Sequence, residues 1–85
     1  MKIELYQKER CPFSEKVRTF IDRNRLRSRV GYRFTDHNGL ALAKLMDLTS
    51  EEKVPVLVVD GKPVEENDQI IKWLDEHLVH ASKVV

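Results

Sequence analysis

Hydrophobic and polar positions alternate at the start of the chain and then change to a helical spacing. The alternation over Lys2–Gln7 places Ile3 and Leu5 on one side and predicts a strand. From Pro12 to about Leu26, apolar residues recur every three or four positions, as on one face of a helix. That stripe is formed by Phe13, Val17, Phe20 and Ile21. The chain therefore begins with a strand followed by an amphipathic helix.

The middle of the chain predicts a second strand and a short second helix. Val30–Asp36 is rich in β-branched and aromatic residues, which favour strands. Asn38-Gly39 interrupts this pattern, and Leu40–Leu48 then returns to helical spacing. We expect this helix to be buried through Leu42, Leu45 and Met46.

The last third of the chain predicts a hairpin. Val54–Val59 is almost entirely Val and Leu, which is typical of a central strand buried on both faces. Asp60-Gly61 signals a tight turn. Lys62–Glu65 follows as a short strand, and Pro63 suits the edge of a sheet.

A closing helix is expected from Asn67, a good N-cap residue, to about His80. Its buried face would consist of Ile70, Ile71, Leu74 and Leu78. The order βαβαββα predicts an α/β fold, with a four-stranded mixed sheet flanked by helices on both faces. We expect a single domain over residues 1–85.

Charge is distributed unevenly along the chain. Residues 1–36 hold ten Lys or Arg against five Asp or Glu, whereas residues 37–85 hold five against nine. The basic half contains the only cysteine, so it favours a thiolate and anionic substrates. A run of arginines also suggests nucleic acid, but no aromatic residues interleave it, so we interpret it as a solvated helix end. The run is Arg23, Arg25, Arg27 and Arg29.

The same composition bears on location. One cysteine cannot form an intramolecular disulfide, so no oxidising compartment is implied. No apolar run approaches the roughly 20 residues of a membrane span, and the basic N-terminus does not resemble a secretory signal. We therefore expect a cytoplasmic monomer that binds neither membrane nor nucleic acid.

The motif Cys11-Pro12-Phe13-Ser14 lies between the first strand and the first helix. Free N–H groups and the helix dipole favour the thiolate of a cysteine at this place. Pro12 suits the first helical turn, where its missing N–H has no partner to lose. Ser14 occupies the place of the second sulfur in a Cys-x-x-Cys pair. We therefore predict Cys11 as a nucleophile with no internal partner, rather than a buried structural cysteine, with Pro12 and Ser14 completing the catalytic positions.

Two questions about this motif stay open at the level of sequence. The Ser14 hydroxyl could hydrogen-bond to the Cys11 sulfur or only to the helix backbone. Phe13 could contact substrates or belong to the core stripe, and we favour the contact. Tyr6 is a further candidate for the wall of the same groove.

Three segments in order make the chain resemble glutaredoxins and the N-terminal glutathione-binding domain of glutathione transferases, which share the thioredoxin fold. They are Tyr6–Ser14, Val54–Leu57 and Glu65–Ile71. The chain departs from the pattern in several places. Pro12 replaces the glycine of cluster-binding monothiol glutaredoxins, and Lys53 replaces the usual threonine before Val-Pro.

The resemblance implies a glutathione-binding set: Lys8, Phe13, Val54, Pro55, Glu66, Asn67 and Asp68. Lys8 would meet the glycine carboxylate of glutathione, with Arg10 as a weaker candidate for that role. Pro55 would be cis, and the backbone of Val54 would pair with the peptide of glutathione.

The start of the closing helix would hold the γ-glutamyl end of glutathione, since helix N–H groups suit a carboxylate. Helix capping alone would also explain Asn67 and Asp68. Trp73 is expected to pack rather than to bind. His77 and His80 lie one turn apart without a third ligand nearby, so no metal site is expected.

A thiol with no internal partner needs an outside thiol to release any mixed disulfide. We therefore predict a glutathione-dependent thiol–disulfide oxidoreductase of monothiol type, with glutathione as co-substrate and glutathionylated proteins or small disulfides as partners. Two alternatives remain. One is a [2Fe–2S] carrier in which two chains and two glutathiones supply the sulfurs. The other is a non-catalytic glutathione-binding module.

Overall fold

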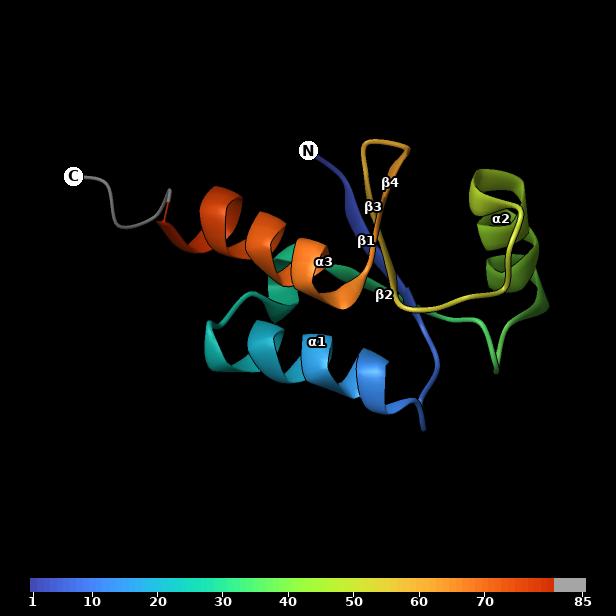
Figure 1. The fold of residues 1–85 in the computed structure, drawn as a ribbon, viewed down its shortest axis with the longest axis horizontal. Coiled ribbons are helices and arrows are strands. Elements are labelled where there is room, and N and C mark those ends of the chain that lie inside the picture. The colour runs from blue at the N-terminus through green and yellow to red at the C-terminus, as the bar shows by residue number, and fades with distance from the viewer. Residues whose placement is uncertain (81–85) are drawn as a thin grey trace.

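The structure is a computed structural model that describes residues 1–80. Its elements confirm the expected order of strands and helices. They are β1 (Ile3–Gln7), α1 (Pro12–Arg23), a 3₁₀ turn η1 (Arg27–Arg29), β2 (Gly31–Phe34), α2 (Gly39–Thr49), β3 (Val56–Val59), β4 (Lys62–Glu65), α3 (Asn67–Leu74) and a π-helical turn η2 (Asp75–Val79). Figure 1 shows α1 and α3 on one side of the sheet and α2 on the other.

The sheet has the strand order β2-β1-β3-β4 and is mixed, as predicted. β1 pairs in parallel with β2, and α1 makes the crossover between them. β1 also pairs antiparallel with β3, and β3 with β4. β1 is therefore paired along both edges, so the residue that follows it leaves the sheet from a fixed place.

Alternation along β1 and β3 sends side chains to opposite faces of the sheet, and each face has its own core. Leu5 and Leu57 are fully buried beneath α1 and α3. Their partners in this larger core include Val17, Ile21, Ile70, Leu74 and Leu78. The smaller core lies under α2 and consists of Tyr6, Ala41, Leu45, Val56 and Val58.

Local side-chain chemistry fixes the turns and the start of α2. Asp60 and Gly61 both have positive φ, at 48° and 85°, as a tight hairpin turn requires. Asp60 Oδ1 also accepts a hydrogen bond from the Lys2 N–H at 2.7 Å. Asn38 caps α2, since its Oδ1 accepts from the backbone N–H groups of Leu40 and Ala41 at 2.9 and 3.2 Å.

The first helix is shorter than its sequence pattern predicts. It ends at Arg23 rather than near Leu26, because Arg25 adopts a left-handed φ of 56° that a helix cannot continue through. Asn24 closes the end, and its Nδ2 donates to the carbonyl of Phe20 at 2.9 Å.

Several expectations about burial are wrong in detail. Met46 is 38% exposed, so it is not part of the buried face expected for the second helix. Phe13 is 64% exposed, which excludes it from the core and agrees with the exposed position favoured from the sequence. The buried face of α2 is formed by Ala41 and Leu45, whereas Leu42 is only half-buried. A helical stripe gives the direction in which a side chain points, but not whether other elements reach far enough to cover it.

Two element boundaries also differ from expectation. β3 begins at Val56, and Val54 and Pro55 precede it as a connecting segment. Glu66, not Asn67, is the N-cap of α3, and Asn67 is already the first helical residue. The final helical stretch does reach the expected region, but its last turn is the π-helical η2. Within residues 1–80, no helix is both long enough and apolar enough to cross a membrane.

Leu57→Ala tests the core beneath the site. Leu57 is fully buried on a central strand, so its truncation should lower the free energy of unfolding by about 2–5 kcal/mol, measured by urea denaturation. Leu40→Ala is the matched control, because Leu40 is 84% exposed and its loss should change stability by less than about 0.5 kcal/mol. Equal effects of the two changes would contradict this assignment of the core.

Candidate functional site

Cys11 is the N-cap of α1, at the corner where the chain turns out of the sheet into the helix. Its backbone is extended, with φ −98° and ψ 118°, and its carbonyl accepts the first helical hydrogen bond from the Glu15 N–H at 2.9 Å. Pro12 occupies the first helical position. The thiol is partly exposed and no side chain caps the helix, so the sulfur stands beside the free N–H groups of the first turn.

The surroundings of the Cys11 thiol act on its pKa in both directions. Burial is the largest single influence and raises the pKa. Hydrogen bonds from the Ser14 N–H, the Ser14 hydroxyl and the Phe13 N–H oppose it, and the positive charge of Lys8 adds to them. Together they lower the pKa of Cys11 below its ordinary value. A larger share of the thiol is therefore ionised at neutral pH than in an unperturbed cysteine.

Ser14 is fully buried beneath this corner. Its hydroxyl helps to lower the pKa of the Cys11 thiol, which favours the first of the two roles left open from sequence. The same oxygen accepts a hydrogen bond from the backbone N–H of Lys8 at 3.3 Å. Ser14 thus connects the segment that precedes the cysteine to the sulfur itself.

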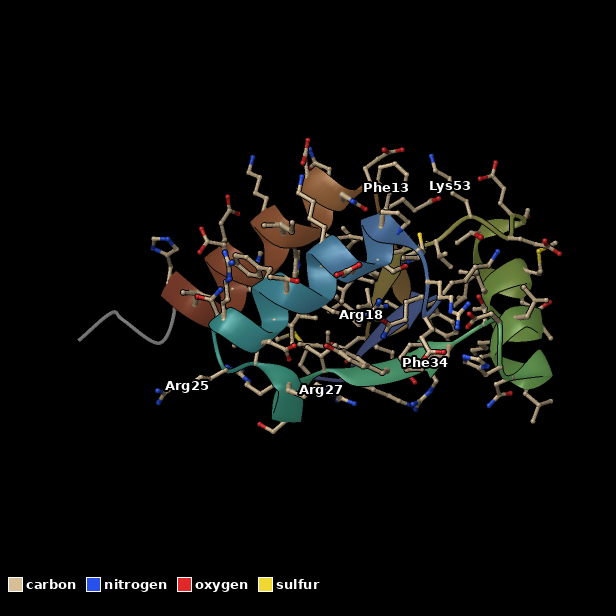
Figure 2. All side chains as sticks on the ribbon, turned by 90° about the horizontal axis from the view of Figure 1, so that it is seen from below. Phe13, Arg18, Arg25, Arg27, Phe34 and Lys53 are labelled. Carbon is tan, nitrogen blue, oxygen red and sulfur yellow. The ribbon has the colours of Figure 1, made fainter. Side chains whose placement is uncertain are left out.

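A cavity of about 410 Å³ opens beside this corner, between the start of α1, the segment before β3 and the start of α3. Figure 2 shows two of its lining residues, Phe13 and Lys53, side by side at one edge of the molecule. The full lining is Phe13, Lys16, Lys53, Val54, Pro55, Glu66, Asn67 and Asp68. The volume is within the range of sites for small ligands.

The rim of the cavity carries two exposed ion pairs. Lys53 Nζ lies 3.3 Å from Glu66 Oε1, and Lys16 Nζ lies 3.8 Å from Asp68 Oδ1. All four charged groups are well exposed, so each pair contributes little to stability and its members can exchange partners readily. The site therefore presents two cations and two anions to a ligand.

The start of α3 forms one wall of the cavity. Glu66 caps the helix with a positive φ of 71°, and Asp68 stands in the first turn. Asn67 Nδ2 donates to the carbonyl of Phe13 at 3.2 Å, which joins the start of α3 directly to the first turn of α1. The backbone N–H groups at the beginning of α3 are suited to a carboxylate.

The structure brings together most of the residues expected to bind glutathione. Six of the seven line one cavity: Phe13, Val54, Pro55, Glu66, Asn67 and Asp68. The Val54–Pro55 peptide bond is cis, as the resemblance implied. Lys8, the seventh, is not among the lining residues, and neither is Arg10. The positive charge of Lys8 lowers the pKa of the Cys11 thiol, and its role in binding glutathione stays a prediction.

Two lining residues were not anticipated from the sequence, namely Lys16 and Lys53. Lys53 directly precedes the Val54-Pro55 pair, and this position beside a segment already expected to bind glutathione could have identified it from the sequence. Lys16 gave no such signal, because its place opposite Asp68 depends on the packing of α1 against α3.

The remaining aromatic and histidine candidates lie elsewhere. Tyr6 is only 3% exposed and packs under α2, so the expectation that it lines the groove is wrong. Trp73 packs against the larger core, as expected, and its ring stacks on His77 at a centroid distance of 4.4 Å. His80 pairs with Asp75 at 3.2 Å. Over residues 1–80, no group of three or more His, Cys, Asp or Glu is arranged to hold a metal ion.

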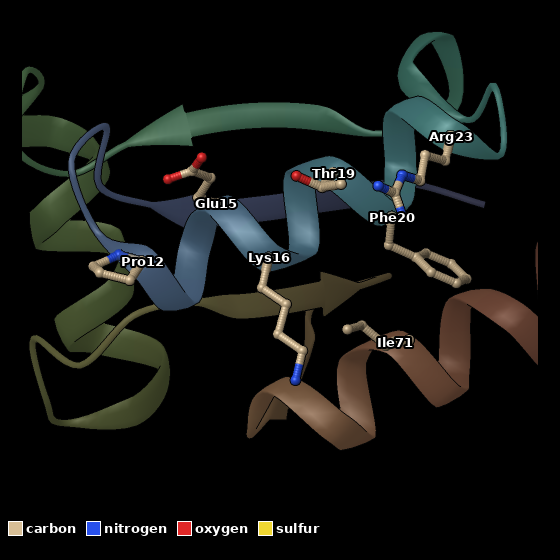
Figure 3. A pocket seen from close by; sticks show the side chains of 7 residues that line it. All are labelled: Pro12, Glu15, Lys16, Thr19, Phe20, Arg23 and Ile71. Carbon is tan, nitrogen blue, oxygen red and sulfur yellow. The ribbon is translucent and has the colours of Figure 1, made fainter.

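A second cavity, of about 450 Å³, is lined by residues of α1 and by Ile71 of α3 (Figure 3). It is slightly larger, but its lining includes neither the Val54–Pro55 segment nor the first residues of α3, and its surface is largely apolar. Lys16 borders both cavities. We place the candidate site in the smaller one, because that one joins the cysteine corner to the start of α3.

Comparison with known proteins identifies the family. The model described as "Glutathione S-transferase, N-terminal domain" matches residues 5–79, so the chain belongs to this family of thioredoxin-fold domains. A curated relative, prostaglandin E synthase 2 of Danio rerio, is 35% identical over 71 residues, which cover 84% of this chain and 17% of that protein. The chain thus spans only a small part of that relative.

Solved structures confirm the fold. A rice glutathione transferase crystallised with glutathione superposes with a TM-score of 0.73 and 24% identity, over 94% of this chain and 35% of that one. Oxidised glutaredoxin 2 of Chlamydomonas reinhardtii gives a TM-score of 0.68 and 19% identity, over 98% of this chain and 84% of that one. The glutaredoxin-like thioredoxin fold expected from the sequence is therefore present.

Ser14→Ala tests how the thiol is activated. Removing a hydroxyl that hydrogen-bonds to the sulfur should raise the pKa of Cys11, so the rate of alkylation by iodoacetamide near pH 7 should fall about threefold or more. The pH profile of alkylation measures both quantities. Ser28→Ala is the control, since Ser28 is exposed in η1. An unchanged profile in Ser14→Ala would show that the hydroxyl does not stabilise the thiolate.

Proposed function

We propose that this domain is a glutathione-dependent thiol–disulfide oxidoreductase of monothiol type, which reduces glutathione mixed disulfides through Cys11. The single observation that supports the proposal best is a thiol of lowered pKa at the start of α1, next to a cavity of ligand size. The chain has one cysteine, so a mixed disulfide on Cys11 must be released by a thiol from outside. The family to which the chain belongs makes glutathione the leading candidate.

The charges of the cavity suit the charges of glutathione, which has two carboxylates and one ammonium group. In the proposed binding mode, the γ-glutamyl carboxylate meets the N–H groups at the start of α3, and Asp68 or Glu66 receives the ammonium group. Of the two lining cations, Lys16 and Lys53, we assign Lys53 to the second carboxylate, because Lys53 directly precedes Val54. The Val54 backbone pairs with the peptide of glutathione, in the manner of an added strand.

The proposed reaction has two exchange steps. The Cys11 thiolate attacks the glutathione sulfur of a mixed disulfide, which forms a Cys11–glutathione disulfide and releases the substrate sulfur as a thiolate that takes up a proton. A second glutathione, as its thiolate, attacks the glutathione sulfur of that intermediate. This step forms glutathione disulfide and returns Cys11 as a thiolate. Overall, the substrate sulfur is reduced to a thiol, and the sulfur of the incoming glutathione is oxidised as it forms glutathione disulfide with the glutathione that came from the mixed disulfide.

The surroundings of Cys11 also fit the expected substrates, which are glutathionylated proteins or small disulfides. Phe13 is 64% exposed two residues beyond the sulfur, where it offers an apolar contact to an incoming chain. Arg10 is exposed just before the cysteine. Free thiol chemistry of this kind operates in a reducing compartment, which is consistent with the cytoplasmic location that we propose.

Turnover of a glutathionylated peptide tests the proposal directly. Glutathione disulfide formation, followed with a coupled reductase, should proceed in the wild-type domain and fall to the uncatalysed rate in Cys11→Ser. Far-ultraviolet circular dichroism of Cys11→Ser confirms that the variant is folded. Absence of turnover by the wild-type domain would overturn the proposal.

Lys53→Gln tests the proposed glutathione site separately from the thiol. Loss of a charge-assisted contact to a carboxylate should raise the KM for glutathione by about threefold to tenfold, with a smaller effect on kcat. Lys62→Gln makes the same change of charge on the exposed strand β4 and should leave the KM unaltered. Similar KM values in both variants would place the carboxylate somewhere other than beside Lys53.

A further inference from the structure

One arginine of α1 holds the segment that leads from β1 to Cys11. Arg18 Nη1 donates to the side-chain Oε1 of Gln7 at 2.7 Å and to the backbone carbonyl of Lys8 at 3.0 Å. Its Nη2 donates to the carbonyl of Glu9 at 2.7 Å. Three successive residues before the active-site corner are thus bound by one guanidinium group.

The position of Arg18 is itself fixed. The guanidinium carbon lies 5.9 Å from the ring centre of Phe34, a favourable cation–aromatic distance. Gln7, which receives one of the hydrogen bonds, is fully buried at the end of β1. In Figure 2, the labels of Arg18 and Phe34 mark this contact between α1 and β2. The planar fork therefore has little freedom to move away from its three acceptors.

The outer side of the same segment is held by groups that follow β2. Asp36 Oδ2 accepts a hydrogen bond from the Glu9 N–H at 3.1 Å, and His37 Nε2 lies 2.8 Å from Glu9 Oε2. These contacts are exposed. Thr35 holds the Gln7 carbonyl through its N–H at 2.8 Å, whereas the carbonyls of Lys8 and Glu9 are held by Arg18.

The held segment connects to the sulfur through Ser14. Lys8 accepts from Arg18 at its carbonyl, at 3.0 Å, and donates its N–H to Ser14 Oγ at 3.3 Å, so this one residue joins Arg18 to Ser14. A hydroxyl has one hydrogen to donate and two lone pairs to accept with. When the Lys8 N–H occupies one lone pair of Ser14 Oγ, the hydroxyl hydrogen can be donated to the Cys11 sulfur, whose pKa the Ser14 hydroxyl lowers.

We propose that Arg18 is a positioning residue for the thiol, and that it fixes Lys8 so that the Ser14 hydroxyl donates to the Cys11 thiolate. Arg18 does not touch the sulfur in this scheme, and its effect travels through the backbone. This role of Arg18 explains what keeps the reacting thiol ionised. Its importance for catalysis rests on the proposed function.

Arg18→Lys separates this role from a simple effect of charge. The substitution keeps one positive charge on α1, but an ammonium group cannot reproduce a planar fork on three acceptors. Iodoacetamide alkylation of Cys11 near pH 6.5 should slow by about threefold to tenfold, the size expected when a hydrogen bond to a charged group weakens. The difference in alkylation rate between Arg18→Lys and the wild type should become smaller as the pH rises, because the thiol then ionises without the help of Arg18. Arg23→Lys, on the same helix, is the control and should match the wild type.

A double-variant cycle tests the route through Ser14. If Arg18 acts by way of the Ser14 hydroxyl, Arg18→Lys should cause no further slowing in a Ser14→Ala background. An alkylation profile of Arg18→Lys equal to that of the wild type would overturn the proposal. Equal slowing of alkylation in both backgrounds would overturn it as well.

A measurement on the unmodified protein keeps the proposal testable if the variants do not fold. Restricted rotation of the Arg18 guanidinium should give separate nuclear magnetic resonance signals for its Nη protons, whereas one averaged signal would overturn the proposal. Alkylation requires no glutathione. A wild-type domain without turnover, together with slowed alkylation in Arg18→Lys, would therefore disprove the proposed function alone.

Discussion

The turn from β1 into α1 is the constraint on which the rest of the site depends. β1 is paired on both edges, and its last residue, Gln7, is fully buried, so the exit from the sheet is fixed. α1 is held against the same sheet by Val17 and Ile21, which are fully buried. Cys11 stands between these two anchored elements as the N-cap of the helix. The direction of the sulfur is therefore set by the packing of the whole sheet.

The second half of the site comes from parts of the chain that are distant in sequence. The segment before β3 and the start of α3 lie beside the first turn of α1 because β3 neighbours β1 and because α3 shares a sheet face with α1. The hydrogen bond from Asn67 to the Phe13 carbonyl joins the two helix starts. The same sheet and helices therefore position both the Cys11 thiol and the cavity with its charged rim. This arrangement suits disulfide exchange between a fixed sulfur and a bound peptide that carries a thiol.

Hydrophobic periodicity was sufficient to predict the sheet, the helices and the Cys11 corner, because these depend on local spacing. It was insufficient where tertiary packing decides. Phe13 continues the helical stripe but extends beyond the core, and Asn67 has the chemistry of a cap while Glu66 takes that place. Lys16 and Arg18 could not be assigned from sequence, because each finds its partners only when separate elements meet.

The most direct test of the central claim is a crystal structure of the protein after reaction with glutathione disulfide. We predict a disulfide between Cys11 and one glutathione, with the tripeptide in the cavity lined by Val54 and Lys53 and its γ-glutamyl end at the start of α3. An unmodified sulfur, or a tripeptide bound on another surface, would contradict the claim that this corner and this cavity form one site.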